Sequence, residues 1–353
     1  MRLWEKNIRQ VVPYVPGEQP AGDKIIKLNT NENPYPPAPG VKKVLADMEA
    51  DRLRKYPDPT ASVLVKELAA HYGLGEDQVF VGVGSDDVLA MSFLTFFNSD
   101  KPVLFPDVTY SFYNVWADLF KVPFETPALK EDFTIDTKDY AKENGGVIFP
   151  NPNAPTGVYM PLDQVEEILK DNQDVVVIVD EAYVDFAGPS AMELLDKYEN
   201  LLVVQTFSKS RSMAGMRIGF AMGHPDLIRA LNDVKYSYNS YTMNLPSLLA
   251  GVEAVKDKSY FESTLAKIVA TRERSKKRLA ELGFTFPDSR SNFIFASHKT
   301  VPAGKIFEAL KKEQIYVRYF KTPGLDNSLR ISIGTDEEMD ALFRFLEAYL
   351  PNA

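Results

Sequence analysis

The chain has 353 residues, of which 45% are hydrophobic and 25% are charged, and its formal net charge is -9. This length and composition predict a globular protein with two domains, and the acidic balance argues against a surface for nucleic acid or an anionic membrane. Because cysteine is absent, disulfides, thiolate metal sites and a cysteine nucleophile are excluded.

Targeting and metal signals are missing from the sequence. The first segment, MRLWEKNIRQVVPY, is charged and lacks the apolar core of a secretory signal, and no run of 18 apolar residues occurs. His71, His224 and His298 are far apart and do not have the spacing of a metal pair. We therefore expect a cytoplasmic enzyme or binding protein without a metal site.

The first two thirds of the chain read as an arm followed by an α/β domain. Residues 13–40 are rich in Pro, Asn and Gly, which predicts an extended arm and loop. Helical periodicity follows in VKKVLADMEADRLRKY and TASVLVKELAAHYG, and then short apolar runs alternate with helical segments. The runs are QVFVGVG, PVLFP, GVIFPNP, DVVVIVDEAY and NLLVVQTFSK. Runs without polar alternation suit strands covered on both faces, so we expect a large, doubly wound, mostly parallel sheet.

The chain changes character after about residue 240. A long charged helix is expected from about residue 260 to 282, and the segments SNFIFAS, KIFEALKKEQ, IYVRYF and SLRISIG follow it. This pattern predicts a smaller α+β domain. We therefore divide the chain into an N-terminal arm (1–34) that packs on the small domain, a large domain (35–240) and a small C-terminal domain (241–353).

Candidate ligand-binding residues follow several of the predicted strands. In an open parallel sheet, ligands bind beyond the carboxyl ends of the strands. The candidate residues are Asn153, Asp180, Tyr183, Ser208 and Lys209, together with Gly82, Gly84, Ser85 and Asp86 at the turn after VFV. Each has an ordinary alternative explanation: glycines pack helices, an aspartate caps one, and most lysines are solvated. Their conjunction at neighbouring strand ends favours a ligand site instead.

The set of groups fits pyridoxal 5'-phosphate. This cofactor requires a lysine for covalent attachment, a carboxylate at its ring nitrogen, a donor at its phenolate oxygen and an anion site for its phosphate. Lys209, Asp180 and Tyr183 offer the first three, and a helix that starts at Ser85 suits a phosphate. Tyr110, in the segment PDVTYSFY, offers an aromatic face for stacking.

Seven segments resemble the fold type I, class II aminotransferases that use pyridoxal phosphate, and among them the histidinol-phosphate aminotransferases. The segments are LNTNENP (28–34), KYPDPTASVLVKELA (55–69), VGVGSDDVL (81–89), PNAPTG (152–157), VDEAYVDF (179–186), SKSRSMAGMRIG (208–219) and LRISIGT (329–335). They occur in order and span nearly the whole chain. The resemblance implies a large domain that binds the cofactor, a small domain, and a homodimer.

The resemblance also implies a role for each candidate residue. Lys209 bonds covalently to the cofactor, Asp180 pairs with the ring nitrogen and Tyr183 binds the phenolate oxygen. The remaining cofactor contacts come from Ser208, Arg217, Gly84, Ser85 and Asp86 at the phosphate, Tyr110 on the ring, and Tyr56 at the phosphate of the neighbouring subunit. The substrate is bound by Arg318 and Arg330, with Tyr14 and Asn29 closing over it.

One position departs from the pattern that the resemblance implies. Ala154 stands where the family usually has an asparagine that contacts the phenolate oxygen, and alanine has no donor. Asn153 is the expected substitute, although neighbouring residues in an extended segment point to opposite sides. Arg211 is assigned no role and is expected to be a solvated charge or one behind the site.

The reaction implied is transamination between L-histidinol phosphate and 2-oxoglutarate, which gives imidazole acetol phosphate and glutamate in histidine biosynthesis by ping-pong kinetics. An aromatic amino acid aminotransferase and an enzyme that decarboxylates threonine phosphate share the same cofactor groups and stay open. A nicotinamide dehydrogenase is disfavoured because Asp87 stands where the third glycine of the fingerprint belongs. A ligand-sensing domain of a transcription factor is disfavoured because no helix-turn-helix segment or basic extension is evident.

Overall fold

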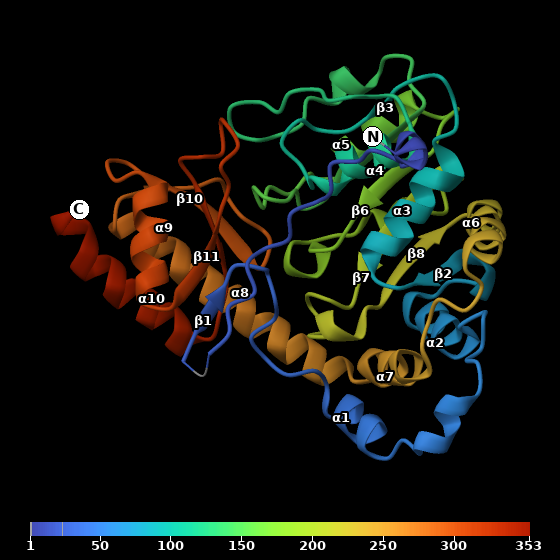
Figure 1. The fold of residues 1–353 in the computed structure, drawn as a ribbon, viewed down its shortest axis with the longest axis horizontal. Coiled ribbons are helices and arrows are strands. Elements are labelled where there is room, and N and C mark those ends of the chain that lie inside the picture. The colour runs from blue at the N-terminus through green and yellow to red at the C-terminus, as the bar shows by residue number, and fades with distance from the viewer. Residues whose placement is uncertain (1, 23) are drawn as a thin grey trace.

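The fold consists of two β-sheets of different size that are joined by one long helix (Figure 1). It is seen in a computed structural model that describes residues 2–22 and 24–353. The joining helix, α8 (Lys258–Glu281), was expected at about residues 260 to 282. None of the helices within the described residues is both long and apolar enough to cross a membrane.

The larger sheet has seven strands, and all but one of them run in the same direction. In spatial order they are β2 (Val79–Gly82), β8 (Gly219–Gly223), β7 (Leu201–Thr206), β6 (Val177–Asp180), β5 (Gly146–Pro150), β3 (Val103–Leu104) and β4 (Phe124–Glu125). Only β8 is antiparallel to its neighbours. The mostly parallel sheet that the apolar runs predict is confirmed.

Helices cover both faces of this sheet. One face packs on α1 (Pro39–Ala46), α2 (Ser62–Tyr72), α5 (Leu162–Asp171) and α7 (Leu245–Lys256). The other face packs on α3 (Ser85–Phe96), α4 (Phe112–Phe120) and α6 (Pro225–Tyr238). Alternate residues of β6 divide between the two cores, with Val177 and Val179 on one side and Ile178 on the other. The sheet is therefore doubly wound, as expected, and its strands are buried on both faces.

The smaller sheet has five strands and its own apolar core. In spatial order they are β1 (Ile26–Leu28), β11 (Ile315–Tyr319), β12 (Leu329–Ser332), β10 (Phe293–His298) and β9 (Phe284–Thr285), with α9 (Ala303–Lys312) and α10 (Asp336–Tyr349) as its further helices. β1 is parallel to β11, whereas the other pairs are antiparallel. Short 3-10 helices complete the regular structure: Leu3–Asn7, Ala50–Arg54, Glu76–Gln78, Thr137–Tyr140, Val184–Phe186, Ala191–Leu194, Ala214–Met216 and Leu350–Asn352.

The passage from the large unit to the small one lies at Asp257. This residue ends α7, and its carboxylate accepts a hydrogen bond from the Tyr260 N–H in the first turn of α8. Because Leu248 and Ala250 of α7 belong to a core of the large sheet, α7 packs with that sheet. The limits 35–240 and 241–353 stay a prediction, and we propose that the second domain begins near Asp257.

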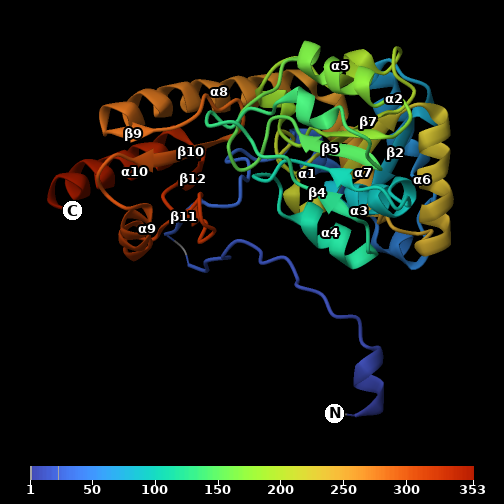
Figure 2. The same cartoon turned by 90° about the horizontal axis from the view of Figure 1, so that it is seen from above.

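The N-terminal segment contacts both units. Its strand β1 joins the small sheet, and the Arg318 guanidinium donates to the carbonyl oxygens of Val15 and Pro16 at 3.3 and 3.4 Å. Earlier in the chain, the ring of Tyr14 stacks on that of Phe112 in α4, with centroids 4.2 Å apart. Figure 2 shows the first residues extending beyond α4 and away from both sheets. The arm thus bridges the two units.

Candidate active site

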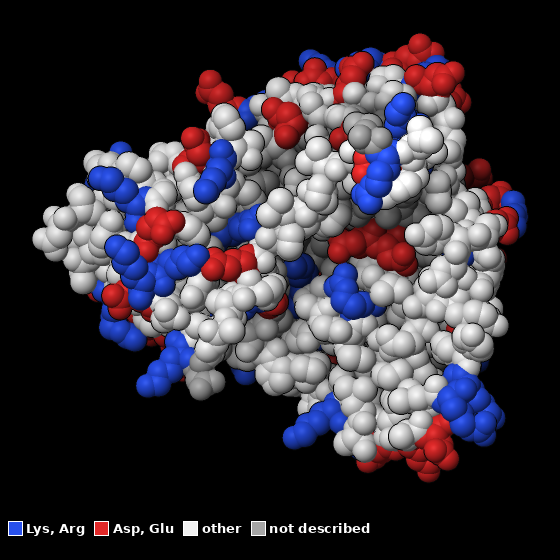
Figure 3. Space-filling view, in the orientation of Figure 1, with Lys and Arg blue, Asp and Glu red and all other residues white. Residues whose placement is uncertain are grey.

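A cavity of about 450 Å³ lies between the two sheets, beyond the carboxyl ends of β5, β6 and β7. Both basic and acidic side chains border the hollow on this face of the molecule (Figure 3). Twelve of the fifteen candidate residues line the cavity: Tyr14, Asn29, Ser85, Asp86, Tyr110, Asp180, Tyr183, Ser208, Lys209, Arg217, Arg318 and Arg330. Strand ends, a helix start and the N-terminal segment therefore meet at one place, as the sequence predicts.

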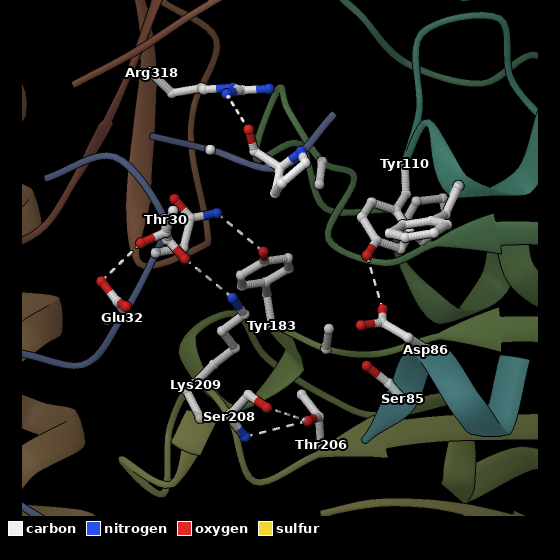
Figure 4. A pocket seen from close by; sticks show the side chains of 18 of the residues that line it. Thr30, Glu32, Ser85, Asp86, Tyr110, Tyr183, Thr206, Ser208, Lys209 and Arg318 are labelled. Carbon is white, nitrogen blue, oxygen red and sulfur yellow. Dashed lines mark hydrogen bonds between the residues drawn. The ribbon is translucent and has the colours of Figure 1, made fainter. Parts of the chain in front are cut away.

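Lys209 enters the cavity from the loop after β7. Its Nζ donates to the carbonyl oxygen of Thr30 at 3.3 Å and lies 5.5 Å from the centroid of the Tyr183 ring (Figure 4). The amide of Asn33 donates to the carbonyl oxygens of Lys209 and Ser210, at 3.1 and 3.0 Å. Because its backbone is held in this way, the amine is presented to the cavity beside a phenol.

Asp180 is the last residue of β6 and is 4% exposed. Its carboxylate accepts a hydrogen bond from the Tyr113 hydroxyl at 2.9 Å and one from the Ala182 N–H at 3.2 Å. Burial raises the pKa of Asp180 to about 6, although both hydrogen bonds oppose that change. A cation placed against this carboxylate would stabilise its ionised form, as a protonated ring nitrogen does.

Two glycines shape the start of α3. Gly84 precedes the helix with φ 86°, and a side chain there would approach an Arg217 Nη to 2.5 Å. A side chain on Gly219 would lie 2.3 Å from the Ser85 nitrogen. Only glycines at both positions let the guanidinium and the first N–H groups of the helix lie this close together. The helix start and the guanidinium form a cradle suited to an anion.

The side chains around this cradle are joined by hydrogen bonds. The Arg217 guanidinium donates to the Ser208 hydroxyl at 3.4 Å and forms an ion pair with Asp86 at 3.3 Å. The Tyr110 hydroxyl donates to the other oxygen of Asp86 at 2.8 Å (Figure 4). Burial raises the pKa of Tyr110 well above its ordinary value, so the phenol stays a donor. Asp86 thus orients Arg217 and Tyr110 at the edge of the cavity.

Two arginines lie next to each other on one face of the small sheet, because Arg318 of β11 is paired in register with Arg330 of β12. Arg330 donates to the carbonyl oxygen of Asn29 at 3.1 Å, and its buried Nε has no hydrogen-bond partner within the described part of the chain. Burial lowers the pKa of Arg330 below its ordinary value. A buried guanidinium with a spare donor suits an anionic ligand.

Three candidate residues do not line the cavity: Gly84, Tyr56 and Asn153. Gly84 lies just before Ser85 and acts through the shape of the turn. Tyr56 is 82% exposed and stacks on Tyr241, with ring centroids 4.6 Å apart. Its expected contact with a neighbouring subunit stays a prediction.

Asn153 points away from the cavity. Its amide nitrogen donates to the Val108 carbonyl oxygen at 3.0 Å and to the Thr156 hydroxyl at 2.9 Å. Ala154 lines the cavity in its place. The amide that was expected to make up for Ala154 is therefore engaged elsewhere, in line with the opposite directions of neighbouring side chains.

Several residues of the site were not assigned from the sequence. They are Thr30, Asn31 and Asn33 in the N-terminal segment, and Tyr113 behind Asp180. The segment LNTNENP was recognised, but only Asn29 was given a role. Tyr113 lies three residues after Tyr110 in the segment PDVTYSFY, but Tyr110 precedes α4, and the sequence carries no signal that the Tyr113 hydroxyl reaches Asp180.

Arg211 corrects one of the two alternatives expected for it, because it is buried and is not a solvated charge. It is 7% exposed, donates to the Ala254 carbonyl oxygen at 3.0 Å and lies over the Phe207 and Phe261 rings, 5.4 and 4.4 Å from their centroids. The guanidinium ties the loop after β7 to α7, which accounts for its burial. Its role is therefore structural.

Known proteins resemble this chain over nearly its full length. Residues 23–346 match the family described as "Aminotransferase class I and II". A histidinol-phosphate aminotransferase of Brachyspira hyodysenteriae is 51% identical over 345 residues, which cover 98% of each chain. One of Clostridium acetobutylicum is 52% identical over 338 residues, 96% of each chain.

The fold has close counterparts too. A histidinol-phosphate aminotransferase of Sinorhizobium meliloti, solved in complex with pyridoxal-5'-phosphate, superposes with a TM-score of 0.81 at 25% identity, over 92% of this chain and 89% of that one. The sequence match and the fold agree with the lysine, carboxylate and anion cradle found in the cavity. The chain belongs to the class I and II aminotransferase family.

Proposed function

We propose that this chain catalyses transamination between L-histidinol phosphate and 2-oxoglutarate, giving imidazole acetol phosphate and glutamate. The observation that carries the proposal is a cavity with an anion site at each end and a lysine between them. One anion site is the start of α3 with Arg217, and the other is the pair Arg318 and Arg330. The relatives at about half identity bear the name of this activity.

The residues fit pyridoxal phosphate at the end formed by the large sheet. The cradle that the two glycines keep open would hold the phosphate, the buried Asp180 would pair with the ring nitrogen, and Lys209 would supply the amine for covalent attachment. When bound, the cofactor supplies an electron sink for the carbon that bears the amine. Tyr183 and Tyr110 border the same space, as donor at the phenolate oxygen and as ring for stacking.

Lys209 has two tasks in this proposal. Its Nζ would hold the cofactor covalently until the substrate amine displaces it. The freed amine would then act as general base and acid, taking the proton from the substrate carbon that bears the amine. The hydrogen bond from Nζ to the Thr30 carbonyl oxygen gives the free amine a resting place inside the cavity.

The arginines select the substrates. Histidinol phosphate carries a phosphate ester where an amino acid has its carboxylate, so one site must take both kinds of anion. Two guanidinium groups share a dianion through several charge-assisted hydrogen bonds, and one alone clamps a carboxylate. The Nε of Arg330, which has no partner in the described chain, is a donor available for this purpose. Tyr14 and Asn29 line the same end and would limit access of water.

The proposal includes a homodimer in which Tyr56 completes the neighbouring site. Support comes from exposed apolar side chains that are close in sequence to Tyr56 or to its stacking partner Tyr241. They are Leu53 at 55%, Tyr238 at 74%, Tyr241 at 46% and Tyr236 at 43% exposure. Clusters of exposed aromatic residues are typical of protein interfaces.

Steady-state rates with competing substrates test the function. We expect the purified protein to be yellow, to lose that colour on adding histidinol phosphate, and to regain it with 2-oxoglutarate. The same assay with phenylalanine measures the aromatic alternative, and release of carbon dioxide from threonine phosphate measures the decarboxylase. A higher kcat/KM for phenylalanine, or release of carbon dioxide, would replace the proposal by the corresponding alternative.

A further inference from the structure

The hydroxyl of Tyr183 has one hydrogen-bond partner among the described residues, and that partner is a donor. The Asn31 amide nitrogen lies 2.9 Å from it. Tyrosine has a single O–H hydrogen and also accepts hydrogen bonds through its oxygen. Because Asn31 occupies the oxygen as a donor, the hydrogen of Tyr183 is left for an acceptor in the cavity.

The direction of this hydrogen bond is fixed by the surroundings of Asn31. Its backbone N–H donates to the Ser332 hydroxyl oxygen at 2.9 Å, and that hydroxyl lies 3.0 Å from the Asn31 amide oxygen. Because Ser332 already accepts one hydrogen bond from the backbone, its own hydrogen is free to donate to the amide oxygen. The amide oxygen thus faces Ser332, and the NH₂ group faces Tyr183.

Asn31 is also rigidly held. It is 1% exposed, its φ is 56°, and its carbonyl oxygen accepts a hydrogen bond from the Asn292 amide at 3.0 Å. Asparagine adopts this left-handed conformation more readily than most residues do. A residue held in this conformation, with both its backbone polar groups and its side chain engaged, is suited to positioning a neighbour.

We propose that Asn31 is a positioning residue that turns the Tyr183 O–H toward the phenolate oxygen of the cofactor. The inference rests on the proposed cofactor site. It accounts for the lack of a donor at Ala154 and for the Asn153 amide's engagement elsewhere. A single phenol then serves the oxygen that two donors would otherwise share, and Asn31 keeps that phenol correctly oriented.

The pH dependence of the cofactor's visible absorbance, in the holoenzyme without substrate, tests this role. A donor at the phenolate oxygen stabilises its negative charge, and so does the proton on the linkage between Lys209 and the cofactor. Removing the donor makes that proton harder to lose, which raises the pH midpoint of the colour change. We expect Tyr183→Phe to raise the midpoint by about 1 unit or more, as for a lost hydrogen bond to a charged group.

Asn31→Gly removes the amide without backbone strain, because glycine accepts a positive φ. We expect it to raise the midpoint by about 0.5–1 unit, a partial loss of the same hydrogen bond. In the Tyr183→Phe background the same change should add nothing further, because Asn31 acts through the hydroxyl. Asn352→Gly, at the exposed end of the helix Leu350–Asn352, is the control for an asparagine-to-glycine change and should leave the midpoint unchanged.

A second variant keeps the test decisive if Asn31→Gly does not fold. Ser332→Ala keeps the Asn31 side chain but removes the hydroxyl that orients its amide and accepts its backbone N–H, so the midpoint should again rise. An unchanged midpoint in Asn31→Gly would overturn the inference, and so would a shift that adds fully to that of Tyr183→Phe. If Asn31→Gly does not fold, an unchanged midpoint in Ser332→Ala overturns it instead. A wild-type protein with no visible cofactor band would contradict the proposed function rather than the role of Asn31.

Discussion

The two walls of the cavity are built in different ways. The wall from the large sheet carries Asp180, Ser208 and Lys209, which follow buried parallel strands. The wall from the small sheet carries Arg318 and Arg330, which project from paired strands and are linked by hydrogen bonds to the N-terminal arm. The residues of the large-sheet wall are thus positioned by the carboxyl ends of strands. Those of the small-sheet wall are positioned by contacts between segments that are far apart in sequence.

This difference corresponds to the proposed division of labour. The large-sheet wall holds the cofactor, which stays in place through the cycle and benefits from rigid surroundings. The small-sheet wall binds two substrates in turn, and its arginines are attached to an arm that also contacts α4 through Tyr14. Changes on the first wall should therefore affect the cofactor, and changes on the second should affect substrate binding.

The largest effect is expected at Lys209. Lys209→Ala removes both the covalent attachment and the acid–base group, so turnover should fall by at least about 10⁴-fold, at the upper end for loss of general acid–base catalysis. Single-turnover absorbance measurements with histidinol phosphate check this. Retained turnover would show that the large-sheet wall does not carry the chemistry.

Glu181 tests what it costs in stability to ionise a buried carboxyl group at the end of the same strand as Asp180. Burial raises its pKa from 4.5 to about 7, although Ser190, the Ala191 N–H and Gln205 donate to its carboxylate. Since the folded state keeps the proton longer, the contribution of Glu181 to stability falls as pH rises from 4.5 to 7. Relative to Glu181→Gln, the free energy of unfolding should fall by about 3 kcal/mol over this range. Chemical denaturation at both pH values measures the difference, and parallel curves would contradict the prediction.

Substitution of Arg330 tests most directly whether substrate binding at one wall is independent of cofactor binding at the other. Arg330→Gln should lower kcat/KM for histidinol phosphate by about 10²-fold, as for one or two lost charge-assisted hydrogen bonds. Arg318→Gln, whose guanidinium is partly exposed and bonded to the arm, should cost about 10-fold. Neither change should alter the cofactor's absorbance or affinity. A loss of cofactor in either variant would mean that the walls are not independent.

Tyr113 provides the complementary test on the large-sheet wall. Tyr113→Phe deletes the hydroxyl that donates to Asp180, so the ionised carboxylate loses a partner and the cofactor should bind about 10-fold more weakly. The KM for histidinol phosphate at saturating cofactor should stay the same. Equilibrium dialysis and steady-state kinetics measure the two quantities, and a changed KM with unchanged cofactor affinity would reverse the assignment.

The two walls also differ in how far the sequence could predict them. Asp180 and Lys209 follow apolar runs that read clearly as buried strands, and parallel strand ends meet at one edge of a sheet. The strand β1 has only three residues, Ile26–Leu28, and nothing in the sequence around it indicates that it pairs with β11. The role of Asn31 was missed for the same reason, since Tyr183 and Ser332 lie far from it in sequence. The direction of the Asn153 side chain and the burial of Arg211 could not be predicted from the sequence, because both depend on the tertiary fold.

The parallel pairing of β1 with β11 has a consequence for how the protein is made. Ile26 is opposite Ile315, so β1 must wait during synthesis for a partner strand that is made much later than itself. The large sheet can form earlier, because its strands end at Gly223. Contacts between such distant segments close slowly. During synthesis, the cofactor cradle should therefore form before the arm can close over it, and the nascent chain acquires substrate selection after the cradle.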